Sequence, residues 1–230
     1  MHRGPRAGDH VTGGQATVGL RVPSHPVAHA LLVGFGGGVA APSANRFGRV
    51  SPTDAAHVVD ELGDVLDPAR DCILEGGPSE VGVESTIVDC TGDAPRLLRP
   101  GAIGVEEIEA VTGLEVAEAD SVVRAPGTLA SHYAPSARLL LVEADEVPAV
   151  SAAVDGPVGL LAPSPVTTPA GAVRLADPVD SAAYARSLYR SLRAADDLGL
   201  ATILAVAPAD GPLAAAVLDR LRRAAHGSGG

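Results

Sequence analysis

The sequence predicts an α/β fold in two parts that are joined by a linker. The clearest observation is a regular alternation of strands and helices after residue 137, which is typical of a small three-layer domain with a mostly parallel sheet. The second is residues 121–136, which have two prolines and little periodicity and therefore indicate a linker. The third is the length of 230 residues, enough for one large or two small domains with apolar cores.

The N-terminal part is expected to consist of short strands and helices around one polar loop. Strands are expected where β-branched and apolar residues cluster, and helices where apolar residues recur every three to four positions. The expected strands are 16–22, 39–41, 72–74, 81–89 and 96–99. The expected helices are 26–33, a helix that begins at Ser51, and 105–111.

The polar loop, residues 42–50, and the helix start that follows it form the most informative stretch of this part. Within eleven residues they carry hydroxyl, amide and guanidinium groups: Ser43, Asn45, Arg46, Arg49, Ser51 and Thr53. Ser51 is a natural N-cap, Pro52 suits the first helical position, and Asp54 completes the spacing of a capping box. Because a helix N-terminus attracts anions, the stretch predicts a site for a negatively charged ligand, most simply a phosphate.

The C-terminal part is expected to hold four strands and three helices in alternation. The expected strands are 138–142, 158–161, 172–175 and 202–206. The expected helices are 147–154, 181–198 and 212–225.

Charge and hydropathy exclude several function classes. The net charge is −11, and all 17 basic residues are arginine, so we expect no tight direct binding to nucleic acid. We find no targeting segment and no apolar stretch long enough to span a bilayer, so we expect a cytoplasmic protein without membrane contact.

Cys72 and Cys90 have no metal-ligand spacing, and buried free thiols are the favoured interpretation over a disulfide or a nucleophile. We assign no residue of the sequence as a metal ligand or as a catalytic residue. Residues 36–41 match the G-x-G-x-x-A fingerprint of dinucleotide-binding folds, but they follow a helix and precede a strand, which is the wrong order. Ser43 and Ser85 lie outside any G-x-S-x-G elbow, so they are better interpreted as hydroxyl donors to one ligand.

Several motifs occur in one order and together resemble a known family. They are Thr17-Val-Gly-Leu-Arg21, Pro42-Ser-Ala-Asn45 with Ser51-Pro-Thr53, Gly82-Val-Glu-Ser85-Thr-Ile-Val-Asp89, and Leu98-Arg99-Pro-Gly101. This set resembles the YrdC-type threonylcarbamoyl-AMP synthases. Residues 125–135 resemble the linker of the long form, which carries a Sua-type C-terminal domain.

The resemblance implies a fold and a domain division. Residues 1–120 would form part of a YrdC-like domain, an open, twisted mixed sheet with helices. Residues 121–137 would be a linker that acts as a lid, with a local packing role as the simpler alternative. Residues 138–228 would form a Rossmann-like three-layer domain.

The resemblance also implies an activity: formation of L-threonylcarbamoyladenylate and pyrophosphate from L-threonine, bicarbonate and ATP, with Mg²⁺ accompanying ATP. The product would pass to a tRNA threonylcarbamoyl-transferase complex. The residues implied for ATP are Thr17, Asn45, Ser51, Arg99 and His132. Those implied for threonine are Arg21, Ser43 and Ser85. Those implied for the lid are Arg124 and Tyr133.

One departure from the family sets an alternative. Family members begin with a segment that holds the threonine pocket and a Lys-x-Arg pair for the nucleotide phosphates, and these 230 residues contain no lysine. We therefore expect a chain that starts after that segment and is impaired as an enzyme. The alternative function is a truncated, non-catalytic remnant that binds a ligand or a partner. An RNA-binding module is a third possibility, which the acidic charge disfavours.

Overall fold

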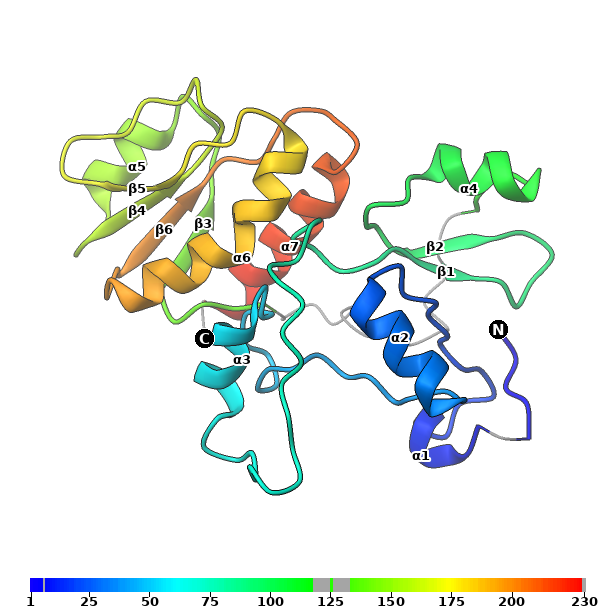
Figure 1. Cartoon of the computed structure of the whole chain (residues 1–230). Helices are drawn as coiled ribbons and strands as arrows, with labels where there is room; N and C mark the ends of the chain where they lie inside the picture. The colour runs from blue at the N-terminus through cyan, green and yellow to red at the C-terminus, as the bar shows by residue number, and fades with distance from the viewer. Residues whose placement is uncertain (6, 118–124, 126–132, 229–230) are drawn as a thin grey trace.

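The computed structural model describes residues 1–5, 7–117, 125 and 133–228, and it shows an α/β chain in two parts (Figure 1). The N-terminal part contains α1 (Asp9–Thr12), α2 (Pro26–Phe35), α3 (Ala55–Leu62), β1 (Ile87–Asp89), β2 (Arg96–Arg99) and α4 (Val105–Thr112). The C-terminal part contains β3 (Arg138–Leu141), α5 (Val147–Ala153), β4 (Val158–Leu161), β5 (Val173–Ala176), α6 (Ser181–Asp197), β6 (Thr202–Ala205) and α7 (Ala214–Gly227).

The C-terminal part is a parallel sheet between two helical layers, which confirms the predicted architecture. Its strand order is β3-β6-β4-β5, and every neighbouring pair is parallel. Helix α5 covers one face, and α6 and α7 cover the other (Figure 1). The two central strands, β4 and β6, are mostly apolar and buried along their whole length, so they need helices on both faces of the sheet.

The two cores follow the period-two alternation of the strands. Leu161 and Ile203 point toward α6 and α7, whereas their neighbours Leu160 and Leu204 point toward Val147 of α5, and all five are completely buried. Helix α6 begins with Asp180 as its N-cap, whose carboxylate accepts a hydrogen bond from the backbone N–H of Ala183 at 2.6 Å.

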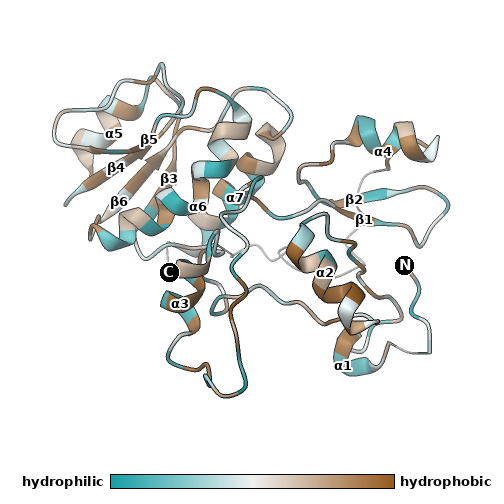
Figure 2. Ribbon diagram, in the orientation of Figure 1, coloured by the Kyte–Doolittle hydropathy of each residue, from teal (hydrophilic) through white to brown (hydrophobic). Residues whose placement is uncertain are grey.

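The N-terminal part is more open. Strands β1 and β2 form a two-stranded antiparallel sheet in which Asp89 lies opposite Arg96. Helix α2 begins at the predicted residue but has no buried residue, although most of its side chains are apolar (Figure 2). Leu31 is 50% exposed and Phe35 is 65% exposed. This helix therefore gains little from burial within the described chain.

Several expected elements of this part do not form. Residues 16–22, 39–41 and 72–74 are not strands, and of the segment 81–89 only Ile87–Asp89 is one. A β-branched or apolar run becomes a strand only where a neighbour supplies hydrogen bonds. Thr17 has only an isolated antiparallel bridge with His2.

The helix expected at Ser51 begins four residues later, so Ser51 is not its N-cap. Asp54 is the cap, and its Oδ1 accepts a hydrogen bond from the backbone N–H of His57 at 3.0 Å. An aspartate carboxylate is as good a cap as a serine hydroxyl and adds a favourable charge at the helix start. Ser51 is instead buried, and its hydroxyl is used elsewhere.

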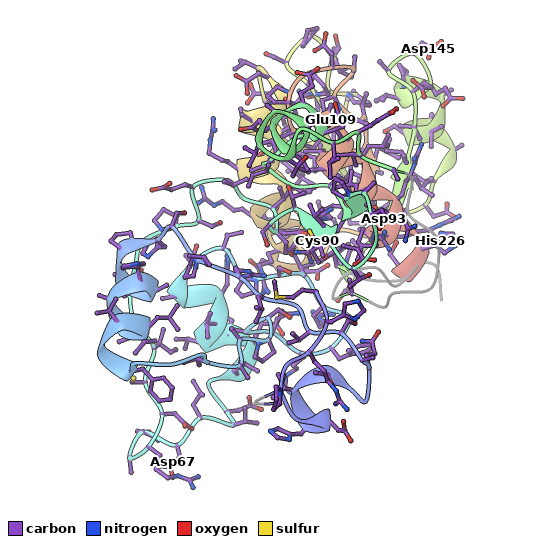
Figure 3. All side chains as sticks on the ribbon, turned by 90° about the vertical axis from the view of Figure 1, so that its right-hand side faces the viewer. Asp67, Cys90, Asp93, Glu109, Asp145 and His226 are labelled. Atoms are coloured by element: carbon purple, nitrogen blue, oxygen red, sulfur yellow. The ribbon has the colours of Figure 1, made fainter. Side chains whose placement is uncertain are left out.

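Both cysteines are free thiols, as expected, but the prediction that they are buried is wrong. Cys72 lies in an irregular segment, and Cys90 follows β1 at the turn that also carries Asp93 (Figure 3). Their apolar neighbours predicted strands with covered faces, and such cover is not found around these two positions. Among the described helices, none is long and apolar enough to cross a membrane.

Candidate functional site

Glu84 is the centre of a polar cluster where the two parts of the chain meet. Its Oε1 accepts a hydrogen bond from the Ser51 hydroxyl at 2.7 Å. Its Oε2 accepts from the Tyr189 hydroxyl in α6 at 2.8 Å and from Nε of Arg220 in α7 at 3.0 Å. We call the following residues the Glu84 cluster: Ser51, Glu84, Arg99, Tyr133, Tyr189 and Arg220.

Arg220 is one of two buried arginines of this cluster, with Arg99. Its fully buried guanidinium pairs with Glu84 and, at 2.7 Å, with Asp219. It also lies over the ring of Tyr133, with 5.7 Å between Cζ and the ring centroid. Burial works against its charge, but Tyr189 and Glu84 outweigh burial and raise the pKa of Arg220 above its ordinary value. The cluster therefore contains a permanent positive charge.

Glu84 is held in its ionised form. Burial raises the pKa of its carboxyl. The charge of Arg220 and the hydrogen bonds from Ser51 and Tyr189 lower that pKa by a larger amount, so the net pKa lies below the ordinary value. Two hydroxyl donors and one guanidinium thus fix this carboxylate in place. It has no proton to give near neutral pH, which fits a structural anchor rather than a general acid.

Tyr133 lies within the predicted linker and belongs to the cluster. Its side chain is 1% exposed, and its ring centroid lies 5.4 Å from that of Tyr189. Its φ of 63° is in the left-handed region, which non-glycine residues adopt only when their surroundings hold them there. Burial and Glu84 raise the pKa of Tyr133, which also interacts with Arg99.

Arg99, the last residue of β2, fixes the backbone next to Glu84. Its Nε and Nη2 both donate to the carbonyl oxygen of Ser85, at 3.1 and 2.8 Å. The side chain is almost completely buried, and burial is the main reason why the pKa of Arg99 is lowered. Arg99 is thus an internal residue that shapes the segment 84–86, not a surface arginine.

Two glycines permit close approaches that build the cluster. A Cβ on Gly82 would lie 2.2 Å from the carbonyl oxygen of Ala185 in α6, and φ of Gly82 is 86°. A Cβ on Gly101 would lie 2.2 Å from the backbone nitrogen of Thr86. Glycine is therefore required for the segment carrying Glu84 to lie against α6 and against the turn after β2.

The polar loop contributes an acceptor that no described protein group uses. Nδ2 of Asn45 donates to the carbonyl oxygens of Arg46 and Arg49, at 2.9 and 3.1 Å. Oδ1 of Asn45 is buried and has no hydrogen-bond partner among the described residues. An unsatisfied buried acceptor is unfavourable, so this atom is suited to receive an N–H or O–H donor from a ligand.

The structure brings some of the predicted site residues together. Ser51, Arg99 and Tyr133 belong to the Glu84 cluster, and Ser85 joins it through its backbone carbonyl. Arg21 and Ser43 are exposed and Thr17 is half-buried, and among the described residues no hydrogen bond or ion pair joins these three to the cluster. His132 and Arg124 lie outside the described residues.

Sequence reasoning missed three members of the cluster: Glu84, Tyr189 and Arg220. Glu84 lies in the motif of residues 82–89, but the motif predicts a ligand contact only for Ser85. Arg220 lies on the buried stripe of α7 with Val217, Leu221 and Ala224. A charged residue at an apolar position of a helix is the signal that could have found it. In the described part of the chain, no group of three or more His, Cys, Asp or Glu residues is arranged to hold a metal ion.

Comparison with known proteins gives family matches to both parts. A family model described as "Telomere recombination", of the Sua5/YciO/YrdC type, matches residues 3–101. A second model, described as "Threonylcarbamoyl-AMP synthase, C-terminal domain", matches residues 103–226. The matched ranges together cover nearly all described residues.

Individual relatives match across the same span. The threonylcarbamoyl-AMP synthase of Pyrococcus abyssi is 35% identical over 93% of this chain and 65% of its own length. That of Bacillus subtilis is 37% identical over 94% of this chain and 65% of its own length. The crystal structure of P. abyssi Sua5 complexed with L-threonine superimposes with a TM-score of 0.82 at 35% identity, covering 96% of this chain and 67% of that one. The chain thus spans about two thirds of these relatives' length.

Proposed function

Because the chain belongs to the Sua5-type threonylcarbamoyl-AMP synthase family, we propose that it forms L-threonylcarbamoyladenylate and pyrophosphate from L-threonine, bicarbonate and ATP. The observation that supports this most is the structural match, with a TM-score of 0.82, to a relative crystallised with L-threonine. The product would serve tRNA threonylcarbamoylation in the cytoplasm, through a transferase complex downstream.

The proposed reaction needs no protein nucleophile. The threonine amine attacks the carbon of carbon dioxide, which forms from bicarbonate with loss of water, and the nitrogen then releases a proton to give a carbamate. A carbamate oxygen then attacks the α-phosphorus of ATP, and the bond to the pyrophosphate oxygen breaks. The protein's task is therefore to hold two anions in line and to stabilise charge on the leaving pyrophosphate.

The residues of this chain can be assigned to that task. Arg21 would pair with the threonine carboxylate, near the hydroxyls of Ser43 and Ser85. The residues proposed for ATP are Thr17, Asn45, Ser51, Arg99 and His132. The buried Oδ1 of Asn45 supports this assignment, because it needs a donor from outside the described chain. Mg²⁺ would enter with the triphosphate, as part of the substrate.

A second candidate is ligand binding without turnover. The observation that favours it is the absence of lysine from all 230 residues, because the resemblance implies a Lys-x-Arg pair that grips the phosphates. Removing one preorganised charge donor typically lowers a rate by roughly 10²–10³. Binding of threonine would survive such a loss better than catalysis.

Pyrophosphate release tests the proposal. The chain is incubated with ATP, Mg²⁺, bicarbonate and threonine, with the B. subtilis relative as positive control and omission of threonine as negative control. Threonine-dependent release supports the synthase. Threonine binding in a calorimeter without any release supports the second candidate. The proposal is contradicted if the chain shows neither threonine binding nor pyrophosphate release.

A further inference from the structure

We propose that Tyr189 and Arg220 of the C-terminal part are positioning residues that hold the ligand-binding segments of the N-terminal part in place through Glu84. The inference deepens the proposed function and rests on it for the identity of the ligands. It makes the Sua-type domain a component of the binding site.

The first step of the argument is connectivity. The Ser51 hydroxyl donates a hydrogen bond to Oε1 of Glu84, while Tyr189 and Arg220 donate to Oε2 of the same carboxylate. Arg220 also donates from Nη2 to the backbone oxygen of Glu84 at 3.4 Å. The Glu84 carboxylate therefore links α6 and α7 to Ser51, the residue that directly follows the polar loop.

The second step concerns what adjoins Glu84. The next residue, Ser85, is proposed to contact threonine, and its carbonyl is gripped by Arg99, which is proposed to contact ATP. On the other side, Tyr133 packs between Arg220 and Tyr189. Residues implied for both substrates and for the lid are thus adjacent to Glu84.

The third step concerns burial. Because the contact of Tyr189 and Arg220 with Glu84 is buried, its loss would destabilise the neighbouring segments. Arg220, Tyr189 and Tyr133 are each at most 2% exposed. In a buried network, removing one donor leaves the remaining partners unsatisfied, and the affected segments shift or loosen. Removing the Tyr189 hydroxyl should therefore loosen the segments that carry Ser51 and Ser85, although Tyr189 lies in another domain.

Helix α6 supplies a matched pair of variants for the test. Tyr189→Phe deletes the hydroxyl that donates to Glu84. Tyr184→Phe deletes an equally buried hydroxyl of the same helix, which donates to the carbonyl oxygen of Leu161 at 3.1 Å inside the C-terminal sheet. A merely structural role for Tyr189 predicts that both variants behave alike.

The first measurement is amide hydrogen exchange in the ligand-free chain. We expect Tyr189→Phe to increase exchange at residues 43–53 and 81–86 by about tenfold relative to Tyr184→Phe, which should affect the C-terminal sheet instead. Equal exchange of these two segments in both variants overturns the inference, whether or not the chain binds threonine.

The second measurement is threonine affinity by calorimetry in the presence of ATP and Mg²⁺. We expect the Kd of Tyr189→Phe to rise about tenfold and that of Tyr184→Phe to stay at the value of the unmodified chain. Equal Kd values for both variants contradict the coupling while leaving the proposed function intact. Failure of the unmodified chain to bind contradicts the proposed function, and the exchange result then decides the inference alone.

Discussion

Arg193 in α6 and Glu61 in α3 form a largely buried ion pair, with 3.1 Å between Nη2 and Oε1. The same Nη2 donates to the carbonyl oxygen of Val50, and Nε of Arg46 donates to the carbonyl oxygen of Glu61 at 3.0 Å. This pair is separate from the Glu84 cluster. The N-terminal part is thus fixed to α6 at a further polar contact, close to the proposed phosphate-binding loop.

Breaking this pair should destabilise the chain strongly. Glu61→Gln keeps the size of the side chain but leaves the buried guanidinium of Arg193 without its counter-charge, so we expect a loss of about 3–5 kcal/mol in the free energy of unfolding. Urea unfolding measures it. Asp64→Asn is the control, because Asp64 forms an exposed pair with Arg46 and should lose only about 0–1 kcal/mol. Equal losses would show that the Arg193–Glu61 contact is not buried in solution.

Gly82→Ala should separate the segment carrying Glu84 from α6. Gly77→Ala is the matched control: φ is 86° at Gly82 and 81° at Gly77, but a Cβ meets the α6 backbone only at Gly82 and meets nothing within 4 Å at Gly77. The control should lose about 1–2 kcal/mol from left-handed strain. Gly82→Ala should lose at least about 1–3 kcal/mol more in urea unfolding. Identical losses would contradict the close approach.

The stability of the chain should depend on pH through Glu84. Its folded pKa is lower than the ordinary value of 4.5, chiefly because Arg220 and two hydroxyl donors outweigh burial. The carboxylate therefore contributes stability that is fully present above about pH 4.5 and is lost as pH falls through the folded pKa. Urea midpoints measured from pH 7 to pH 3 should fall more steeply for the unmodified chain than for Glu84→Gln. Parallel curves would contradict a lowered pKa.

Arg21→Ala should weaken threonine binding without affecting the fold. Arg21 is exposed, so its removal should leave the urea midpoint unchanged. Loss of a charge-assisted pair to the threonine carboxylate corresponds to roughly a 10- to 100-fold rise in Kd. Calorimetry checks this, with Arg70→Ala as control, since Arg70 is exposed and pairs with Asp67 in its own turn. An unchanged Kd in Arg21→Ala would remove Arg21 from the site.

The C-terminal fold could be predicted from the sequence because its signals are local. Strand β4 is a four-residue apolar run that is buried on both faces, and α6 repeats its apolar residues at helical spacing. Each boundary there agrees with the expectation within two residues. In the N-terminal part, residues 72–74 have a similar apolar run but no neighbouring strand among the described residues, and local pattern cannot reveal whether a partner exists.

The site was predictable only in part, for the same reason. The motifs pointed to Ser51, Arg99 and Tyr133, and the structure gathers all three. Their common partner could not be found by periodicity, because Glu84 and Arg220 are separated by 136 positions. Ser51 illustrates the limit: its sequence context suits a helix cap, but a buried carboxylate from a distant segment takes its hydroxyl instead.

The ion pairs Arg220–Glu84 and Arg193–Glu61 across the boundary restrict how this protein can evolve by recombination. A gene fusion that joined this N-terminal part to the C-terminal domain of a distant relative would have to preserve an arginine opposite Glu84 and another opposite Glu61. A mismatch at either position would leave a charge enclosed without compensation. The halves are therefore expected to have been inherited together and to change in pairs, so chimaeras between relatives should function only when both arginines are transferred with their carboxylates.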